Sequence, residues 1–220
     1  LIALISETKS LVGTAQAAKI HFTCVQSALP LVAPPINAFF QDISAECSLD
    51  ITAMSSEHVY QHIANKEIDI ALCCSPPPEH IKNIKADYLF SEPLVFTCLA
   101  DSPYPSAVRV HDLRLKDQIL VHWHKTYMMW QEQWFGCVHS PYLCIRNSTI
   151  IPEFFHNQKT WAILPISIAS RMGRTFRTCQ LDHMPPERPF YLASNYPEPE
   201  PYFSEIKQII LDTFTGYAQE

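Results

Sequence analysis

The stretch from residue 19 to residue 74 constrains the fold most, because strand-like and helix-like segments alternate along it. The strand patterns lie at 19–26 (KIHFTCVQ), 48–54 and 68–73, and the helix patterns between them lie at 31–40 and 57–65. Strands joined in this way by helices form a βαβαβ unit of an open parallel sheet. Such sheets bind ligands at the carboxyl ends of their strands. We therefore expect a binding site among the residues that follow these strands.

The second half of the chain repeats the alternation. Strand patterns occur at 93–100, 118–124, 142–145, 161–165 and 188–193, and helix patterns occur at 128–135, 149–157 and 202–214. We predict an α/β protein of two Rossmann-like lobes joined by a two-strand hinge. The predicted boundaries are 1–17 for the end of a linker helix, 18–92 and 193–220 for lobe I, and 93–192 for lobe II.

Charge and length exclude several classes of protein. The chain has 220 residues, with 16 Lys and Arg against 22 Asp and Glu, which gives a formal charge of −6. Affinity for nucleic acid depends largely on neutralising phosphates, so these residues are a poor DNA binder by themselves. There is no apolar run of membrane-spanning length and no secretory signal pattern, and we expect a cytoplasmic protein.

The eight cysteines are scattered, and most lie inside apolar, strand-like runs. Free cysteine behaves as a small buried apolar residue, so we expect reduced, buried thiols. The adjacent Cys73 and Cys74 are expected on opposite faces of a strand, with redox sensing as the less favoured alternative.

The chain resembles the effector-binding domain of LysR-type transcriptional regulators, which has the fold of type 2 periplasmic binding proteins. The matching segments, in order, are KIHFTCVQSA, VAPPINAFF, HVYQHIANKEIDIAL, SEPLVFTCLADSPY and WAILPISIA. Two glycine positions of the family are replaced, one by Lys66-Glu67 and the other, a Gly-x-Gly, by residues 158–160. Without glycine, we expect negative φ angles at both places.

The resemblance implies a bacterial regulator in which a small effector, often a carboxylate or aromatic acid, binds between the lobes. It also implies a side-by-side homodimer of this domain, a homotetramer of the full-length protein, and DNA binding through an N-terminal helix–turn–helix that these residues do not include. No enzymatic activity and no cofactor are predicted, and the identity of the effector is left open.

The candidate ligand-binding residues lie where strands end and helices begin. They are Gln26, Ser27, Ala28, Ser55, Ser56, His122, Trp123, His124, Ser148, Thr149 and Trp161. Free N–H groups at helix starts favour an anion there. For the serines and Thr149 the alternative is a simple N-cap, and for Trp161 it is a place in the core.

His122 and His124 also allow a zinc site, because Cys137, His139 and Cys144 follow closely. In a strand, alternation would place both histidines on one face and Trp123 on the other. The absence of a paired CxxC or HExxH motif weakens the metal hypothesis, and a core or surface role for each histidine stays open.

Two other functions compete with the sensor. A solute-binding protein for a transporter has the same fold, but it is expected to carry a secretory signal. A two-lobed enzyme would need a nucleophile with a base, and the chain has four glycines and no GxSxG, P-loop or GxGxxG motif.

Overall fold

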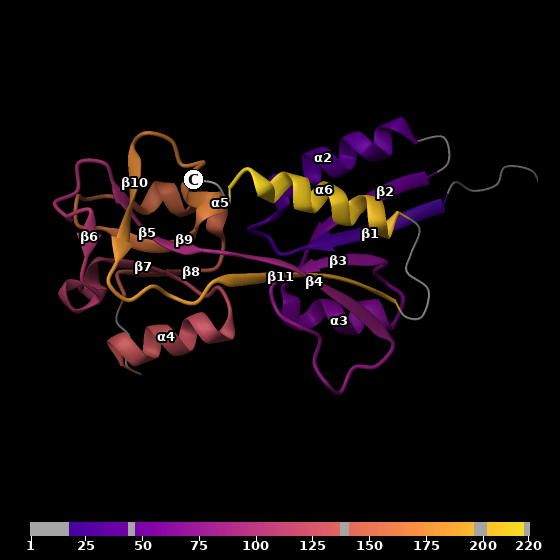
Figure 1. Cartoon of the computed structure of the whole chain (residues 1–220), viewed down its shortest axis with the longest axis horizontal. Coiled ribbons are helices and arrows are strands. Elements are labelled where there is room, and N and C mark those ends of the chain that lie inside the picture. The colour runs from indigo at the N-terminus through magenta and orange to yellow at the C-terminus, as the bar shows by residue number, and fades with distance from the viewer. Residues whose placement is uncertain (1–17, 44–46, 137–140, 196–201, 218–220) are drawn as a thin grey trace, which may run out of the picture.

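The computed structural model describes residues 18–43, 47–136, 141–195 and 202–217, which form two lobes placed end to end (Figure 1). The predicted linker helix at 1–17 lies outside the described residues. Each lobe is built on one sheet, as the two-lobed α/β prediction requires.

Lobe I is the five-stranded sheet with strand order β2-β1-β3-β11-β4 and its helices. Its elements are β1 (Ala18–Cys24), α2 (Leu29–Asp42), β2 (Cys47–Ala53), α3 (Ser56–Ala64), β3 (Ile70–Cys73), β4 (Ile84–Glu92), β11 (Arg188–Asn195) and α6 (Phe203–Thr215). Strand β1 is parallel to β2 and β3, as the βαβαβ pattern predicts, whereas β11 is antiparallel to both of its neighbours.

The two faces of the lobe I sheet are covered by different helices. Helices α2 and α6 pack on one face, over Phe22 and Leu72, and α3 packs on the other face, over Ala71 (Figure 1). Cys74 belongs to the first of these clusters and Cys73 to the second, so the prediction of opposite faces is confirmed.

Lobe II is the six-stranded sheet with strand order β6-β10-β5-β9-β7-β8. Its elements are β5 (Leu94–Leu99), β6 (Ala107–Val108), η1 (Val110–Asp112), η2 (Leu115–Asp117), β7 (Gln118–Val121), α4 (Lys125–Phe135), β8 (Leu143–Ile145), η3 (Ser148–Phe154), β9 (Trp161–Pro165), α5 (Ile166–Ala169) and β10 (Phe176–Leu181). Helix α4 covers one face of this sheet, and η3 and α5 cover the other.

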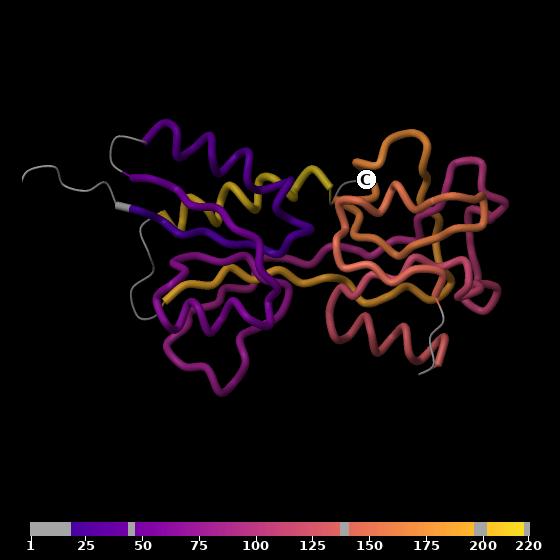
Figure 2. The backbone as a smooth tube through the Cα atoms, turned by 180° about the vertical axis from the view of Figure 1, so that it is seen from behind, coloured from indigo at the N-terminus to yellow at the C-terminus, as the bar shows by residue number. Residues whose placement is uncertain are grey.

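Two segments of chain connect the lobes, one from β4 to β5 and one from β10 to β11 (Figure 2). The first crossing is Pro93, between Glu92 and Leu94. The predicted return to lobe I is at residue 193, and pairing of β11 with β4 begins at Arg188, opposite Glu92. The two crossings therefore meet where these two charged residues pair.

The structure differs from the sequence expectations in local detail. Strand β7 ends at Val121, so the alternation predicted for 122–124 does not apply, and α4 begins at Lys125. The segment predicted as a helix at 149–157 is the 3₁₀ helix η3. Strand β10 is not predicted by the sequence analysis.

The expectation of negative φ at Lys66 is wrong, since its φ is 60°. Lys66 follows the C-cap residue Asn65 of α3, and its N–H donates to the carbonyl of Ile63. This left-handed position after a helix usually carries glycine, and a side chain there costs roughly 1–2 kcal/mol. At 158–160 no positive φ occurs, as expected.

The described cysteines are free, and all of them except the exposed Cys144 are buried, which confirms the prediction of buried thiols for those six. Burial raises the pKa of Cys74 to about 11 and that of Cys24 to about 12. Such thiols carry little thiolate at neutral pH, and so they are poor nucleophiles and poor redox sensors.

Candidate functional site

A cavity of about 200 Å³ lies between the lobes. Lobe I contributes the residues that follow β1 and the first turn of α2, and lobe II contributes η3, α5 and the residues just after α5. The lining residues are Ser27, Pro30, Leu31, Ser148, Thr149, Pro152, Ser167, Ile168, Arg171 and Met172. The carboxyl end of β1 therefore faces this cavity, where the fold class is expected to bind ligands.

A buried ion pair joins the two hinge crossings. Arg188 is 1% exposed and Glu92 is 4% exposed. The guanidinium Nε of Arg188 donates to Glu92 Oε1 at 2.8 Å, and Nη2 donates to the same oxygen. A charge buried this deeply is stable only when it is paired and hydrogen-bonded, so each residue fixes the other.

The same ion pair holds one residue of the cavity from each lobe. Arg188 Nη1 donates to Ser27 Oγ at 2.6 Å, and Glu92 Oε2 accepts from the backbone N–H of Ser167 at 3.3 Å. The Trp123 ring lies on the guanidinium, 5.4 Å from Cζ to the ring centroid, in a cation–π arrangement. Ser27 and Ser167 are thus linked through a buried ion pair of zero net charge.

Ser167, one of the residues that line the cavity, has an unsatisfied hydroxyl. The residue is fully buried and lines the cavity, yet its Oγ has no hydrogen-bond partner. A buried polar group without a partner costs roughly 1–3 kcal/mol, and a ligand oxygen that reaches such a group would recover this cost.

Three candidates from the sequence line the cavity together: Ser27, Ser148 and Thr149. The N-cap alternative does not describe Ser27, since α2 has Ala28 at its N-cap and Ser27 accepts from Arg188. Asn147, rather than Ser148 or Thr149, caps η3, because its Oδ1 accepts from the Thr149 N–H at 3.0 Å.

The candidates around the first two strands behave differently from Ser27. Gln26 is exposed and Ala28 is buried, and neither lines the cavity. Ser55 Oγ bonds His58 Nδ1 at 2.8 Å, and Ser56 Oγ accepts from the Cys74 N–H at 2.8 Å. Both serines are therefore used within lobe I, outside the cavity lining.

The aromatic candidates are structural in this arrangement. Trp161 is fully buried in the lobe II core, stacks on Phe96, and donates from Nε1 to the Arg114 carbonyl at 3.1 Å. Trp123 Nε1 donates to the Ile163 carbonyl at 2.7 Å. Neither ring lines the cavity.

The two histidines also lie outside the cavity lining. His122 is exposed, and its Nε2 lies 3.4 Å from Cys144 Sγ. No cluster of three metal-binding side chains occurs in the described ranges, and Cys137 and His139 fall outside them.

His124 is the N-cap of α4, where its Nδ1 accepts from the Tyr127 N–H at 3.3 Å. Burial, and secondarily the positive charge of Arg188, lower the pKa of this imidazole from 6.5 to about 4. His124 is thus held neutral at physiological pH.

We expect the domain to lose stability as the pH falls from 6.5 towards 4. Across that range the unfolded chain binds a proton at His124 while the folded chain, with its pKa of about 4, does not, so protonation favours unfolding. Asn is a preferred N-cap and does not titrate, so His124→Asn should flatten this slope. Urea unfolding at several pH values measures it, and equal slopes for wild type and variant would contradict the expectation.

Sequence reasoning misses Glu92, Arg188, Ser167 and Arg171. A signal was present for the first two: a carboxylate and a guanidinium each stand at the edge of an apolar strand, in SEPLVF and RPFYLA. Charges are rarely buried unless they are paired, so these two residues were candidates for pairing with each other. No local signal marks Ser167 or Arg171.

This fold and the cavity between its lobes define a two-lobed binding protein of type 2 periplasmic-binding-protein architecture. A model of the LysR substrate binding domain matches residues 14–214. The chain belongs to this family, which confirms the resemblance found in the sequence. No curated protein sequence matches the chain.

Solved structures share the fold. The reduced OxyR regulatory domain from Pseudomonas aeruginosa has a TM-score of 0.71 at 16% identity, and the match covers 89% of this chain and 98% of that one. The CcmR regulatory domain from Synechocystis has a TM-score of 0.70 at 15% identity, and the match covers 89% of this chain and 96% of that one. A mutant of OxyR from Corynebacterium glutamicum has a TM-score of 0.69 at 14% identity, and the match covers 99% of this chain and 70% of that one.

Within the described residues, no helix has the length and apolar character needed to cross a membrane.

Proposed function

We propose that this chain is the effector-sensing part of a transcription regulator, and that it binds a small organic anion, such as a carboxylate, between its lobes. The observation that carries the proposal is the cavity whose lining comes from both lobes. A ligand that contacts both lobes changes the relative free energies of the conformations in which the lobes are differently positioned. It shifts the equilibrium between these conformations only by its differential affinity for them.

The chemistry of the lining supports an anionic ligand. Ser27, Ser148 and Ser167 contribute hydroxyl groups and Arg171 presents a guanidinium, whereas the Thr149 hydroxyl donates to Asn147 Oδ1 at 2.7 Å. Hydrogen bonds to a charged acceptor are stronger than those to a neutral one. The structurally similar CcmR regulatory domain is in complex with 2-PG, so the fold accommodates a small ligand in at least one relative.

The action of the whole protein is part of this proposal. DNA contact would come from an N-terminal helix–turn–helix, in the cytoplasm, with this domain pairing side by side and the full-length protein forming a tetramer. Binding of the effector would then change the geometry of the dimer and so the affinity for DNA.

Thr149→Trp should abolish ligand binding while leaving the fold intact. Thr149 is exposed and lines the cavity, so a large side chain there fills the space without entering a core. The measurement is a thermal-shift screen of small carboxylates, amino acids and aromatic acids, because a ligand that binds only the folded state raises the unfolding midpoint.

The matched control is Thr178→Trp, an exposed position on β10 that does not line the cavity. The control should respond to ligands as wild type does. A ligand that raises the midpoints of wild type and Thr149→Trp equally binds elsewhere, and that result would remove the cavity from the proposal.

A further inference from the structure

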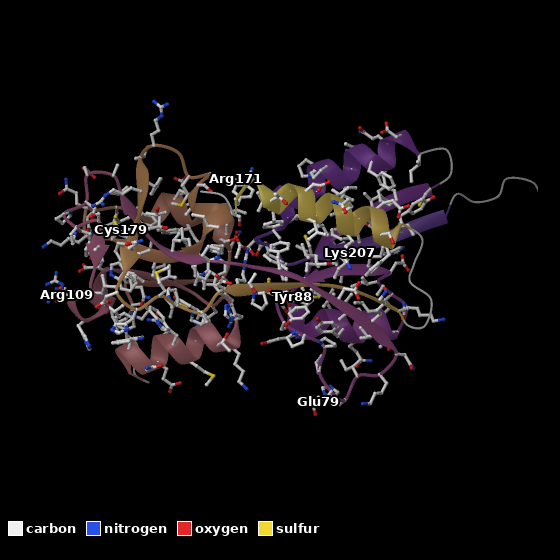
Figure 3. All side chains as sticks on the ribbon, in the orientation of Figure 1. Glu79, Tyr88, Arg109, Arg171, Cys179 and Lys207 are labelled. Atoms are coloured by element: carbon white, nitrogen blue, oxygen red, sulfur yellow. The ribbon has the colours of Figure 1, made fainter. Side chains whose placement is uncertain are left out.

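Arg171 reaches across the cavity from lobe II to lobe I. Its Nη1 donates to the carbonyl of Pro30, in the first turn of α2, at 3.3 Å. Figure 3 places this side chain at the boundary between the lobes. Both residues line the cavity, so the contact lies on its wall.

The sequence of α2 explains why this carbonyl is available. In a regular helix the Pro30 carbonyl accepts from the N–H of residue 34, but Pro34 has no N–H to give. The Arg171 guanidinium supplies a donor in its place. This contact is single and exposed, so water replaces it at small cost when Arg171 turns to another acceptor.

The charged side chains around the cavity can balance one anionic group of a ligand. Among the described residues that line it, Arg171 alone is charged. The ion pairs of the described residues do not include Arg171. Behind the cavity, Arg188 and Glu92 neutralise each other. A second carboxylate in the ligand would therefore lack a cation.

The hydroxyls of Ser27 and Ser167 are suited to a neutral oxygen. Ser27 Oγ accepts from Arg188, which leaves its own hydrogen free to donate, and the buried Ser167 Oγ has no partner at all. An alcohol or keto oxygen of the ligand would satisfy this buried hydroxyl. The penalty for leaving it unpaired would then favour ligands that carry such an oxygen.

The walls and the size limit the rest of the ligand. The apolar lining is aliphatic: Pro30, Leu31, Pro152, Ile168 and Met172. A cavity of about 200 Å³ is smaller than the roughly 300–1,000 Å³ of sites for drug-sized molecules. A compact aliphatic body fits these walls better than an aromatic ring.

We propose that the ligand is a small aliphatic monocarboxylate with one additional alcohol or keto oxygen. Its carboxylate accepts hydrogen bonds from the Arg171 guanidinium, which then no longer donates to the Pro30 carbonyl. Its second oxygen accepts a hydrogen bond from the Ser167 hydroxyl. Arg171 is then the residue that selects for a negative charge. This assignment rests on the proposed function and narrows it to one class of acid.

The test uses matched probes on the whole chain, by thermal shift and by calorimetric titration. The oxygenated acids are lactate, pyruvate and levulinate; the comparison set is propionate, valerate, lactamide, succinate and benzoate. An oxygenated monocarboxylate should bind best. Its deoxy partner and its amide should each bind at least about tenfold more weakly, the loss expected from one buried or charged hydrogen bond.

Variants separate the two ends of the ligand. Arg171→Met should weaken the acid at least about tenfold and abolish the preference for acid over amide, while Arg171→Lys retains that preference. Ser167→Ala should remove the advantage of the oxygenated acid over its deoxy partner and leave the preference for acid over amide unchanged. Arg174→Met, an exposed arginine outside the lining, is the control and should bind as wild type does.

The assignment is overturned if succinate, benzoate or an amide binds best, if Arg171→Met binds the acid as wild type does, or if no oxygenated acid binds. Thr149→Trp distinguishes the two levels of failure. If another probe class binds and Thr149→Trp blocks it, the cavity stays the effector site and only this class of acid is wrong. If no probe is sensitive to Thr149→Trp, the proposed function fails as well.

Discussion

Replacing Glu92 by Leu is expected to lower the free energy of unfolding by about 3–5 kcal/mol, because it leaves the Arg188 guanidinium buried without a counter-charge. Arg188 is 1% exposed, so water cannot reach the orphaned charge. The Ser167 N–H loses its acceptor in the same variant. Urea unfolding at neutral pH measures the loss.

The double variant Glu92→Leu, Arg188→Met tests whether the pair acts as a unit. It removes both charges, so it should be more stable than the sum of the two single losses predicts. The control is Asp50→Asn, which breaks the exposed ion pair with Lys19 and should cost no more than about 1 kcal/mol. Additive losses in the double variant would contradict the coupling.

Trp161→Ala should destabilise the domain by about 3–5 kcal/mol, the usual cost of deleting a large core ring. The indole is fully buried, stacks on Phe96 and donates to the Arg114 carbonyl, so the substitution leaves both a void and an unpaired acceptor. Chemical denaturation measures the free energy of unfolding of this variant. The control is Met129→Ala, a change at an exposed side chain, which should lower that free energy much less.

A milder change at Trp161 tests the role that the sequence assigned to it. Trp161→Phe keeps an apolar ring in the core and should leave ligand affinity unchanged, because this residue does not line the cavity. A loss of affinity as large as that of Thr149→Trp, with stability retained, would return Trp161 to the binding site.

Not every candidate that follows a strand lines the cavity, because contacts with residues distant in the sequence decide where each side chain lies. Ser27, Ser148 and Thr149 line the cavity, and each lies three or four residues after the end of a strand, β1 or β8. Ser55 and Ser56 stand at an equivalent place after β2, but their hydroxyls bond to His58 and to the Cys74 N–H. Nothing local to the sequence distinguishes the two cases.

The sequence alone determined the strand and helix alternation, the two lobes, the family and the burial of six of the thiols, because hydrophobic periodicity and the order of segments are local properties. Only the tertiary structure decided which side chains meet between the lobes. Glu92 lies 75 residues from Ser167 along the chain, and Arg171 lies 141 residues from Pro30. Contacts over such separations depend on how two independently patterned lobes pack together, and the pattern within either lobe does not encode that packing.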